Sequence, residues 1–238
     1  KKRTAPVQAA VLELLGAAGE CACRELTELT GASSSTFSRL EKLGLITLWE
    51  QELQPELLSP AQEAAQPPVL NDEQQAAFDG LRLQMQGQKP GAALLYGVTG
   101  SGKTAVYIRL IYEALQEGKS AILLVPEISL TPQLLGRLSA HFGETVAVLH
   151  SSLRISERFA QWRRIQSGQA RVVVGTRSAV FAPVQNPGLF ILDEEQEHTY
   201  KSENSPRYHA REIALYRGAK AGALVLLGSA TPSVESMY

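Results

Sequence analysis

Residues 97–104, which read GVTGSGKT, constrain the fold of this chain more than any other feature of the sequence. They fit the pattern Gly-x₄-Gly-Lys-Ser/Thr, directly after the apolar run 92–96 and directly before the amphipathic run 104–117. A glycine-rich loop between a strand and a helix turns its backbone N–H groups and the helix N-terminus toward one anion, and so cradles phosphate oxygens. We therefore predict a nucleotide-binding loop in which Lys103 contacts the β- and γ-phosphates and the Thr104 hydroxyl is a ligand of Mg²⁺. The other loop residues predicted to contact the nucleotide are Gly97, Thr99, Gly100, Ser101 and Gly102.

Short apolar runs alternate with amphipathic runs from residue 92 onward. Continuous apolar strands joined by helical crossovers are typical of a parallel sheet that helices cover on both faces, so the predicted fold class is α/β. The predicted strands are 92–96, 121–125, 146–149, 172–174, 189–192 and 224–227. The predicted helices between them are 104–117, 132–142, 155–167 and 209–218.

An acidic cluster follows the strand predicted over 189–192, with Asp193 and Glu194 as its first members. Because parallel strands present their carboxyl ends at one edge of the sheet, we expect this cluster beside the glycine-rich loop. Asp193 is then placed to hold Mg²⁺ through water, and Glu194 to orient or deprotonate a water that attacks the phosphate.

The segment 71–75, NDEQQ, opens a helix before the glycine-rich loop. Gln74 has two interpretations there. As the third residue of a capping box it reaches back to the N-cap residue, Asn71. Alternatively, its amide makes a bidentate contact to the edge of an adenine. The sequence alone leaves both open.

The N-terminal part differs in charge from the rest of the chain. Residues 1–68 hold six basic and nine acidic side chains, whereas residues 69–238 hold seventeen basic and fifteen acidic ones. The segment 54–68 is rich in proline and has no sustained hydrophobic period, which is typical of a linker. We predict a winged-helix domain at 1–60, a linker at 61–70 and the α/β domain at 71–238.

The winged-helix prediction depends on a helix-turn-helix pattern. A helix over 23–29, a turn with a glycine, and a helix over 33–43 opened by serines that can cap it form this pattern. An additional helix over 7–15 precedes it, and an apolar strand over 45–49 adds the wing. Such modules often place their second helix in a DNA groove, but they also bind proteins, and this one is net acidic. Direct DNA contact by this module therefore stays open.

The composition excludes several classes of protein. The chain has 238 residues and a net charge of −1, and no apolar run reaches the ~18 residues that cross a bilayer, so we expect no membrane partner. Its charged start has no Met and no apolar segment behind it, so we expect a piece of a longer protein rather than a signal peptide. Cys21 and Cys23 are too close for an ordinary disulfide and too few for a zinc site, which favours reduced thiols in the cytoplasm.

Five segments of the α/β part resemble, in order, motifs I, Ia, Ib, II and III of DEAH-like superfamily 2 helicases; they are 97–104, 126–133, 175–179, 193–196 and 228–232. Three segments are similar in sequence to the primosomal replication-restart helicases: PEISLTPQ, GTRSAVFAP and DEEQEHTYKSENSPRYHARE. That family has a winged helix before its first helicase lobe, so the resemblance covers essentially the whole chain. It implies a RecA-like first lobe that binds ATP and Mg²⁺, in an ATP-dependent 3′ to 5′ DNA helicase of replication restart. The implied partners are single-stranded and forked DNA, other primosome proteins and single-strand-binding proteins.

The predicted DNA contacts lie in these motifs. Thr131 and Gln133 lie at a predicted helix start, which is a seat for a backbone phosphate or a plain helix cap. Thr176 and Arg177 follow a strand and offer a hydroxyl and a fork of donors to another phosphate. In the family, an aromatic-rich loop after motif II couples single-strand engagement to hydrolysis, and the resemblance carries that role to Tyr200, Lys201, Tyr208 and Arg211.

A coupling link between the nucleotide and DNA sites is also implied, in which the hydroxyls of Ser229 and Thr231 bond to Gln196. The family usually has His at the position of Gln196. Because a Gln amide can both donate and accept, the link can survive this departure.

Two other functions stay open: a P-loop ATPase with a non-nucleic-acid partner, and a winged-helix regulator that only senses ATP. Unchanged single-strand affinity in Arg177→Ala would favour the first, and turnover without strand separation the second. The sequence given has no second lobe and no motif for an arginine finger, which is worth about 10³ to 10⁵ in rate, so we expect the isolated chain to hydrolyse ATP poorly. Zinc is expected only in a C-terminal part of the full-length protein beyond the sequence given.

Overall fold

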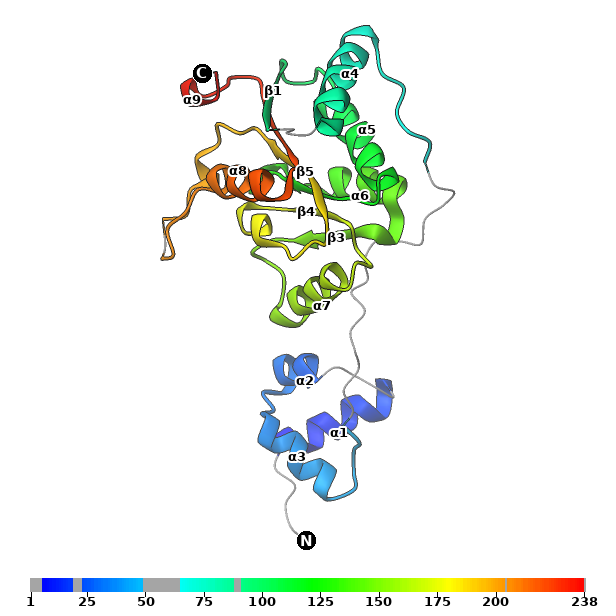
Figure 1. Cartoon of the computed structure of the whole chain (residues 1–238). Coiled ribbons are helices and arrows are strands. Elements are labelled where there is room, and N and C mark those ends of the chain that lie inside the picture. Colours follow the sequence, from blue (N-terminus) through cyan, green and yellow to red (C-terminus); the bar gives the residue numbers. More distant parts are fainter. Residues whose placement is uncertain (1–5, 19–22, 49–64, 88–90, 204, 238) are drawn as a thin grey trace. The chain divides into compact units, whose positions relative to one another are not determined.

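The computed structural model describes residues 6–18, 23–48, 65–87, 91–203 and 205–237 (Figure 1). Contacts within the chain divide it into two compact units, Lys1–Glu52 and Leu53–Tyr238. Each unit is described by itself below. The predicted domain boundaries at residues 60 and 70 stay a prediction, because residues 49–64 lie outside the described part.

The described residues of the first unit form three helices, α1 (Pro6–Ala18), α2 (Cys23–Thr30) and α3 (Ser34–Lys42). They pack around a small core of buried side chains: Val11, Leu26, Ala32, Phe37 and Leu40. Gly31 turns the chain between α2 and α3 with a φ of 70°, which confirms the predicted helix-turn-helix order. The predicted serine cap is absent, because the Ser33 hydroxyl contacts the hydroxyls of Ser35 and Thr36 instead of a backbone N–H group.

The strand predicted over 45–49 is wrong in its described part, residues 45–48. These residues fold back onto α3 instead of pairing with a strand. The N–H group of Leu45 donates to the carbonyl of Leu40, and that of Leu48 donates to the Glu41 carboxylate. Trp49, the last residue of the predicted strand, lies outside the described residues. Residues 45–48 therefore supply no wing for the predicted winged helix.

The second unit is built on one six-stranded sheet with every neighbouring pair parallel, as predicted. The strand order is β1-β6-β5-β2-β4-β3. The strands are β1 (Ala92–Tyr96), β2 (Ser120–Leu124), β3 (Val146–Leu149), β4 (Val172–Gly175), β5 (Pro187–Asp193) and β6 (Leu224–Ser229).

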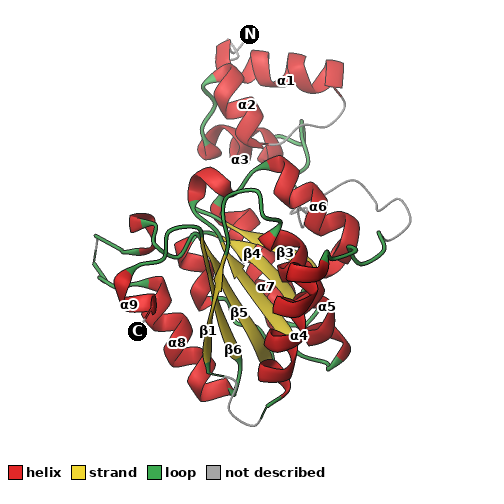
Figure 2. Cartoon of the chain, turned by 90° about the horizontal axis from the view of Figure 1, so that it is seen from above, coloured by secondary structure: helices red, strands yellow, loops and turns green. Residues whose placement is uncertain are grey.

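Helices cover both faces of this sheet (Figure 2). Side chains of α4 (Asp72–Gln86), α5 (Lys103–Gln116) and α6 (Pro132–Phe142) share one core with alternate strand residues. Side chains of α7 (Ile155–Gln166) and α8 (Ala210–Ala221) share the other. The apolar strand runs are continuous because both faces of the sheet are buried.

The strand register brings the ends of β1, β6 and β5 to one level. Tyr96 of β1 lies beside Ser229 of β6, and Asp193 of β5 lies beside Gly228. The segments that leave these ends are the glycine-rich loop and motifs II and III, so they meet at one edge of the sheet. The short elements not named so far are η1 (Glu127–Ser129), η2 (Gly143–Thr145), η3 (Arg177–Phe181), η4 (His198–Tyr200) and α9 (Val234–Met237). None of the helices in the described residues is long and apolar enough to span a membrane.

Candidate nucleotide and nucleic-acid site

The loop 97–104 has the backbone that its glycines allow. Gly100 and Gly102 have φ values of 82° and 83°, in the left-handed region that favours glycine. A Cβ atom on Gly97 would lie 2.8 Å from the Ser101 hydroxyl oxygen, so a side chain there would crowd the turn. The loop leads directly into α5, so the free N–H groups at the N-terminus of α5 lie beside the loop.

Lys103 and Glu194 meet across this loop. The Lys103 Nζ donates to the Gly97 carbonyl at 2.8 Å and lies 4.0 Å from Glu194 Oε1. Glu194 has a φ of 48°, an uncommon backbone conformation for a residue other than glycine. Such outliers gather at functional sites, where surrounding structure holds a side chain in one direction. The predicted meeting of the glycine-rich loop with motif II is confirmed.

Asp193 and Thr104 line one open cavity of about 190 Å³. The Tyr107 hydroxyl donates to Asp193 Oδ1 at 2.9 Å, which fixes the carboxylate. Mg²⁺ is usually bound through one or two carboxylates together with waters and substrate phosphates, so a hydroxyl and a carboxylate beside a phosphate loop fit this ion. Burial raises the pKa of Asp193 above its ordinary value of 3.8, although the Tyr107 hydrogen bond acts in the opposite direction.

The raised pKa of Asp193 predicts a pH dependence of Mg²⁺ binding. Only the carboxylate form holds the ion, so we expect Mg²⁺-dependent nucleotide affinity to fall as the pH drops through a window above 3.8. Titrations with a fluorescent nucleotide at a series of pH values measure this. Asp193→Asn removes the titrating group and should abolish that part of the pH dependence. Wild-type affinity that stays level down to pH 3.8 would contradict the prediction.

Gln74 forms the predicted capping box. Its Oε1 accepts from the Asn71 N–H at 3.1 Å, and its own N–H donates to Asn71 Oδ1 at 2.9 Å. Its Nε2 also donates to the Ser101 carbonyl at 2.8 Å, so the side chain ties α4 to the phosphate loop. Both amide atoms thus have protein partners, and the alternative contact to adenine stays a prediction.

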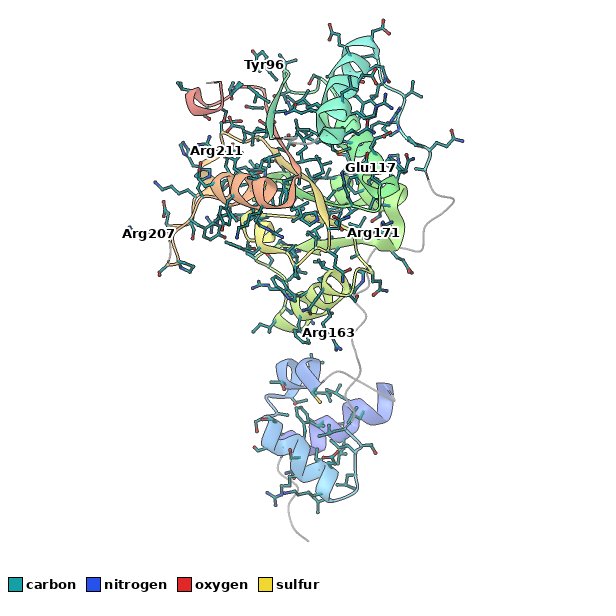
Figure 3. The ribbon with its side chains drawn as sticks, viewed as in Figure 1. Tyr96, Glu117, Arg163, Arg171, Arg207 and Arg211 are labelled. Carbon is teal, nitrogen blue, oxygen red and sulfur yellow. The ribbon has the colours of Figure 1, made fainter. Side chains whose placement is uncertain are left out.

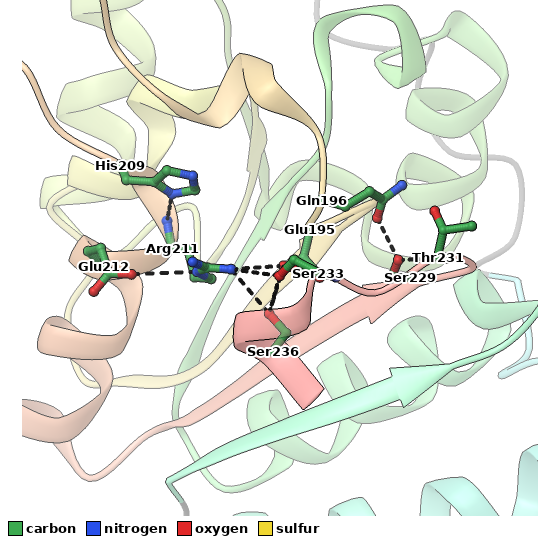
Figure 4. Close-up of polar contacts among 9 residues, drawn as sticks. All are labelled: Glu195, Gln196, His209, Arg211, Glu212, Ser229, Thr231, Ser233 and Ser236. Atoms are coloured by element: carbon green, nitrogen blue, oxygen red, sulfur yellow. Dashed lines mark hydrogen bonds and ion pairs between the residues drawn. The ribbon is translucent and has the colours of Figure 1, made fainter. Parts of the chain in front are cut away.

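Gln196 carries the predicted link to motif III (Figure 4). Its Oε1 accepts from the buried Ser229 hydroxyl at 2.5 Å, and its Nε2 donates to Glu194 Oε2 at 2.9 Å. The amide therefore uses its donor and its acceptor at once, which confirms that glutamine can make this link. The predicted bond from the Thr231 hydroxyl to Gln196 is wrong for this structure: Thr231 instead contacts the link through its backbone, because its N–H donates to the Ser229 hydroxyl oxygen at 3.0 Å.

Arg211 was predicted to contact DNA, and this stays a prediction, although the structure shows its guanidinium bonded within the protein. Its Nη1 lies 3.3 Å from Oε2 of Glu195, whose side chain is fully buried. The same nitrogen donates to the hydroxyls of Ser233 and Ser236, at 3.0 and 3.2 Å. Arg211 is 17% exposed and faces this interior cluster, so a phosphate has little access to it. The sequence analysis did not identify Glu195, Ser233 and Ser236 as members of this cluster. A signal was present, because side chains alternate in direction along a strand and DEEQ follows the strand predicted over 189–192, so this alternation points Glu195 away from Glu194 and Gln196.

Tyr200 was predicted to stack on a DNA base, which is also wrong for this structure. The side chain is fully buried, and its hydroxyl donates to the carbonyls of Leu124 and Asp193, at 3.0 and 2.6 Å. Burial raises the pKa of Tyr200 well above its ordinary value. Its ring therefore packs under the sheet edge, and its hydroxyl holds the end of β5 against β2.

Tyr208 of the aromatic-rich loop lies beside Arg177, the first residue of η3. The Arg177 guanidinium carbon lies 5.9 Å from the centre of the Tyr208 ring, and that ring meets Phe181 edge to face at 4.9 Å. Arg177 Nη1 donates to the carbonyls of Thr199 and Lys201, while its buried Nε has no partner. A phosphate at Arg177 would therefore share or replace the backbone bonds that hold this loop.

The remaining predicted DNA contacts lie at the same sheet edge. Thr131 accepts from the Leu134 N–H at 3.3 Å as the cap of α6, and it lines the 190 Å³ cavity together with Gln133. Thr176 is 4% exposed and lines a smaller cavity of about 100 Å³ beside Arg177. Lys201 is exposed. These contacts stay predictions.

A P-loop α/β lobe with these motifs defines a class of nucleotide-driven motor proteins, and the comparison with known families agrees. Residues 59–238 match the DEAD/DEAH box helicase family, so this chain belongs to that family. The predicted RecA-like helicase lobe and the resemblance to replication-restart helicases are confirmed.

Two curated relatives and one solved structure define the similarity further. Replication restart protein PriA of Bacillus subtilis (strain 168) is 45% identical over 213 residues, which are 89% of this chain and 26% of that protein. Replication restart protein PriA of Chlamydia pneumoniae is 45% identical over 236 residues, which are 97% of this chain and 31% of that protein. The structure of RecG bound to a three-way DNA junction has a TM-score of 0.54 and 28% identity, covering 72% of this chain and 22% of RecG. The chain thus spans under a third of the length of these relatives.

Proposed function

We propose that this chain is the ATP-binding lobe of an ATP-dependent 3′ to 5′ DNA helicase that acts in replication restart in the cytoplasm. The two relatives named replication restart protein support this proposal through their identity across most of the chain. The proposed substrates are ATP and single-stranded and forked DNA. The proposed partners are other primosome proteins and single-strand-binding proteins.

One observation carries the proposal. Thr104 and Asp193, which belong to the nucleotide half, line the same cavity as Thr131 and Gln133, which belong to the proposed DNA half. Asp193 ends β5 and Thr131 follows β2, and these two strands are neighbours in the parallel sheet, so a shift at one residue reaches the other over a short path. A motor that converts hydrolysis into movement along DNA needs such proximity.

In the proposed mechanism, Lys103 leaves the Gly97 carbonyl and binds the β- and γ-phosphates. Thr104 and Asp193 would hold Mg²⁺, which when bound neutralises charge that develops on the phosphates. Glu194 accepts a proton from the attacking water, and Gln196 holds the Glu194 carboxylate through its Nε2. The Ser229 hydroxyl, which belongs to motif III, donates to Oε1 of the same Gln196 amide.

On the DNA side, the α6 N-terminus with Thr131 and the donors of Arg177 are proposed to hold successive backbone phosphates. Tyr208 offers a half-buried ring for an unpaired base, and Lys201 offers an exposed cation beside it. These groups read no base identity, as expected for a protein that moves along DNA of any sequence.

ATP hydrolysis by the full-length protein, with and without forked DNA, tests the proposal. We expect DNA to stimulate hydrolysis by the wild-type protein, and Lys103→Ala to lower the stimulated rate by about 10²- to 10³-fold, because a charge that stabilises the transition state is lost. Lys220→Ala, at an exposed lysine of α8, is the matched control and should keep the wild-type rate. Hydrolysis that ignores DNA, together with unchanged single-strand affinity in Arg177→Ala, would favour an ATPase with a non-nucleic-acid partner.

A further inference from the structure

The hydroxyl of Tyr107 is a buried polar group that the proposed mechanism does not use. Tyr107 lies on α5, one turn after Lys103, and α5 leads from the glycine-rich loop to Glu117, which Figure 3 labels. Tyr107 is 1% exposed and packs in the core that α4, α5 and α6 share with the sheet. A phenylalanine would fill the same apolar space without a hydroxyl, so packing alone does not account for this group.

The partner of this hydroxyl is the side chain of Asp193. Tyr107 donates to Asp193 Oδ1 at 2.9 Å from one face of the sheet. From the other face, the Tyr200 hydroxyl donates to the Asp193 carbonyl at 2.6 Å. Asp193 is therefore held between two buried tyrosines, and of these two it is Tyr107 that acts on the carboxylate.

Gly228 leaves the space that the Tyr107 hydroxyl occupies. In the strand register, Gly228 of β6 lies beside Asp193 of β5. A Cβ atom on Gly228 would lie 1.8 Å from the Tyr107 hydroxyl oxygen and 3.4 Å from Asp193 Oδ1. Glycine weakens the interior of a strand and often marks a close approach of another group. Gly228 is not among the glycines with a positive φ, so it is the space for the hydroxyl that requires glycine here.

A hydrogen bond to one oxygen restricts the rotation of a carboxylate. Asp193 lines the 190 Å³ cavity together with Thr104, the other proposed Mg²⁺ ligand, which lies three residues before Tyr107 on the same helix. Residues three apart on a helix are neighbours, so one turn of α5 supplies a proposed ligand and the donor that fixes the second one. Carboxylates that bind metals are usually hydrogen-bonded in turn, and loss of such a partner typically costs about 10- to 100-fold in metal affinity.

We infer that Tyr107 is a positioning residue for the proposed Mg²⁺ site: its hydroxyl sets the orientation of the Asp193 carboxylate, and Gly228 keeps the place of that hydroxyl open. This role rests on the proposed function and adds to it a residue, Tyr107, that none of the five motif segments contains. Tyr107 touches neither the ion nor ATP. Because it acts through Asp193, its loss changes binding of the ion and not binding of the nucleotide without the ion.

Equilibrium binding of a fluorescent nonhydrolysable ATP analogue to the full-length protein, titrated with Mg²⁺, tests this role without turnover. We expect Tyr107→Phe to raise the Mg²⁺ concentration that half-saturates the protein–analogue complex by about 10- to 100-fold. Affinity for the analogue in EDTA should stay near that of wild type, since the loop 97–104 is unchanged. In a double-mutant cycle, Tyr107→Phe should have no further effect in the Asp193→Asn background, because the effects of residues in contact are not additive.

Tyr112→Phe is the matched control. Tyr112 lies on the same helix, and its hydroxyl donates to the carbonyls of Ala65 and His141, both at 3.1 Å, instead of to Asp193. This variant should keep the Mg²⁺ dependence of wild type. Gly228→Ala reaches the Tyr107 hydroxyl from β6 and should shift the Mg²⁺ dependence in the same direction as Tyr107→Phe; if it does not fold, the cycle with Asp193→Asn decides.

Any of four results would overturn the inference: an unchanged Mg²⁺ dependence in Tyr107→Phe, an equal loss of analogue affinity with and without Mg²⁺, the same shift in Tyr112→Phe, or a folded Gly228→Ala with the Mg²⁺ dependence of wild type. The second result would make Tyr107 a residue of the core alone. Wild-type Mg²⁺ dependence in Asp193→Asn would instead count against the proposed Mg²⁺ site itself, so the two failures are distinguishable.

Discussion

Replacing Glu194 with glutamine is expected to slow ATP hydrolysis by about 10²- to 10⁴-fold, the loss typical of removing a general base. The amide keeps the size of the side chain but cannot accept a proton from water. Lys103 and the loop 97–104 are unchanged in this variant, so the affinity for ATP should stay near that of wild type. Rapid-quench hydrolysis and equilibrium nucleotide binding on the same preparation separate the two effects.

Glu197→Gln is the matched control for this prediction. Glu197 lies three residues further along the chain and is half-buried, but it does not face Lys103 among the described contacts. This variant should hydrolyse ATP at the wild-type rate. Equal rates in Glu194→Gln and Glu197→Gln would remove Glu194 from its catalytic role, and lost ATP binding in Glu194→Gln would make it a structural residue of the pocket.

Truncating Tyr200 to alanine is expected to cost about 3–5 kcal/mol of the free energy of unfolding, the usual range for a fully buried aromatic side chain. The ring is completely buried, and its hydroxyl holds the ends of β2 and β5. Tyr200→Phe keeps the ring and loses only the hydrogen bonds, so it should cost about 1 kcal/mol. Denaturant unfolding of the chain measures both values.

DNA binding separates this structural role from base stacking. Tyr200→Phe should bind single-stranded DNA as tightly as wild type, whereas Tyr208→Ala should weaken binding by about 1–3 kcal/mol, the usual worth of one stacked base. The burial of Tyr200 would be contradicted by the reverse pattern: an unaltered unfolding free energy in Tyr200→Ala with a marked loss of DNA affinity.

The order and type of elements in the second unit could be predicted from the sequence, because each has a strong local signal. Strands buried on both faces are continuous apolar runs such as 172–174, and helices such as α6 begin with a capping threonine and a proline. In a parallel sheet, the loops that follow the strands lie at one edge. This is why the contact between Lys103, which follows β1, and Glu194, which follows β5, could be predicted. The segment 45–48 is also apolar, but the N–H groups of Leu45 and Leu48 bond to α3 instead of to a neighbouring strand. Composition does not show which of these two partners the N–H groups take.

Side-chain direction after a strand end could not be predicted in this way. Tyr200 and Tyr208 have the same chemistry and lie in the same segment, but η4 turns the first inward while the second stays half-buried near Arg177. Arg211 similarly has the composition of a phosphate ligand, and only the buried carboxylate of Glu195 shows where its charge is used. Both depend on contacts between segments distant in sequence, which local patterns do not encode.

A structure of the protein with a nonhydrolysable ATP analogue and Mg²⁺ tests the central claim most directly. The account predicts the triphosphate within the loop 97–104, with Lys103 Nζ moved from the Gly97 carbonyl to the β- and γ-phosphates and the ion between Thr104 and Asp193. A structure in which Lys103 stays on the Gly97 carbonyl while the analogue binds at another surface would contradict it.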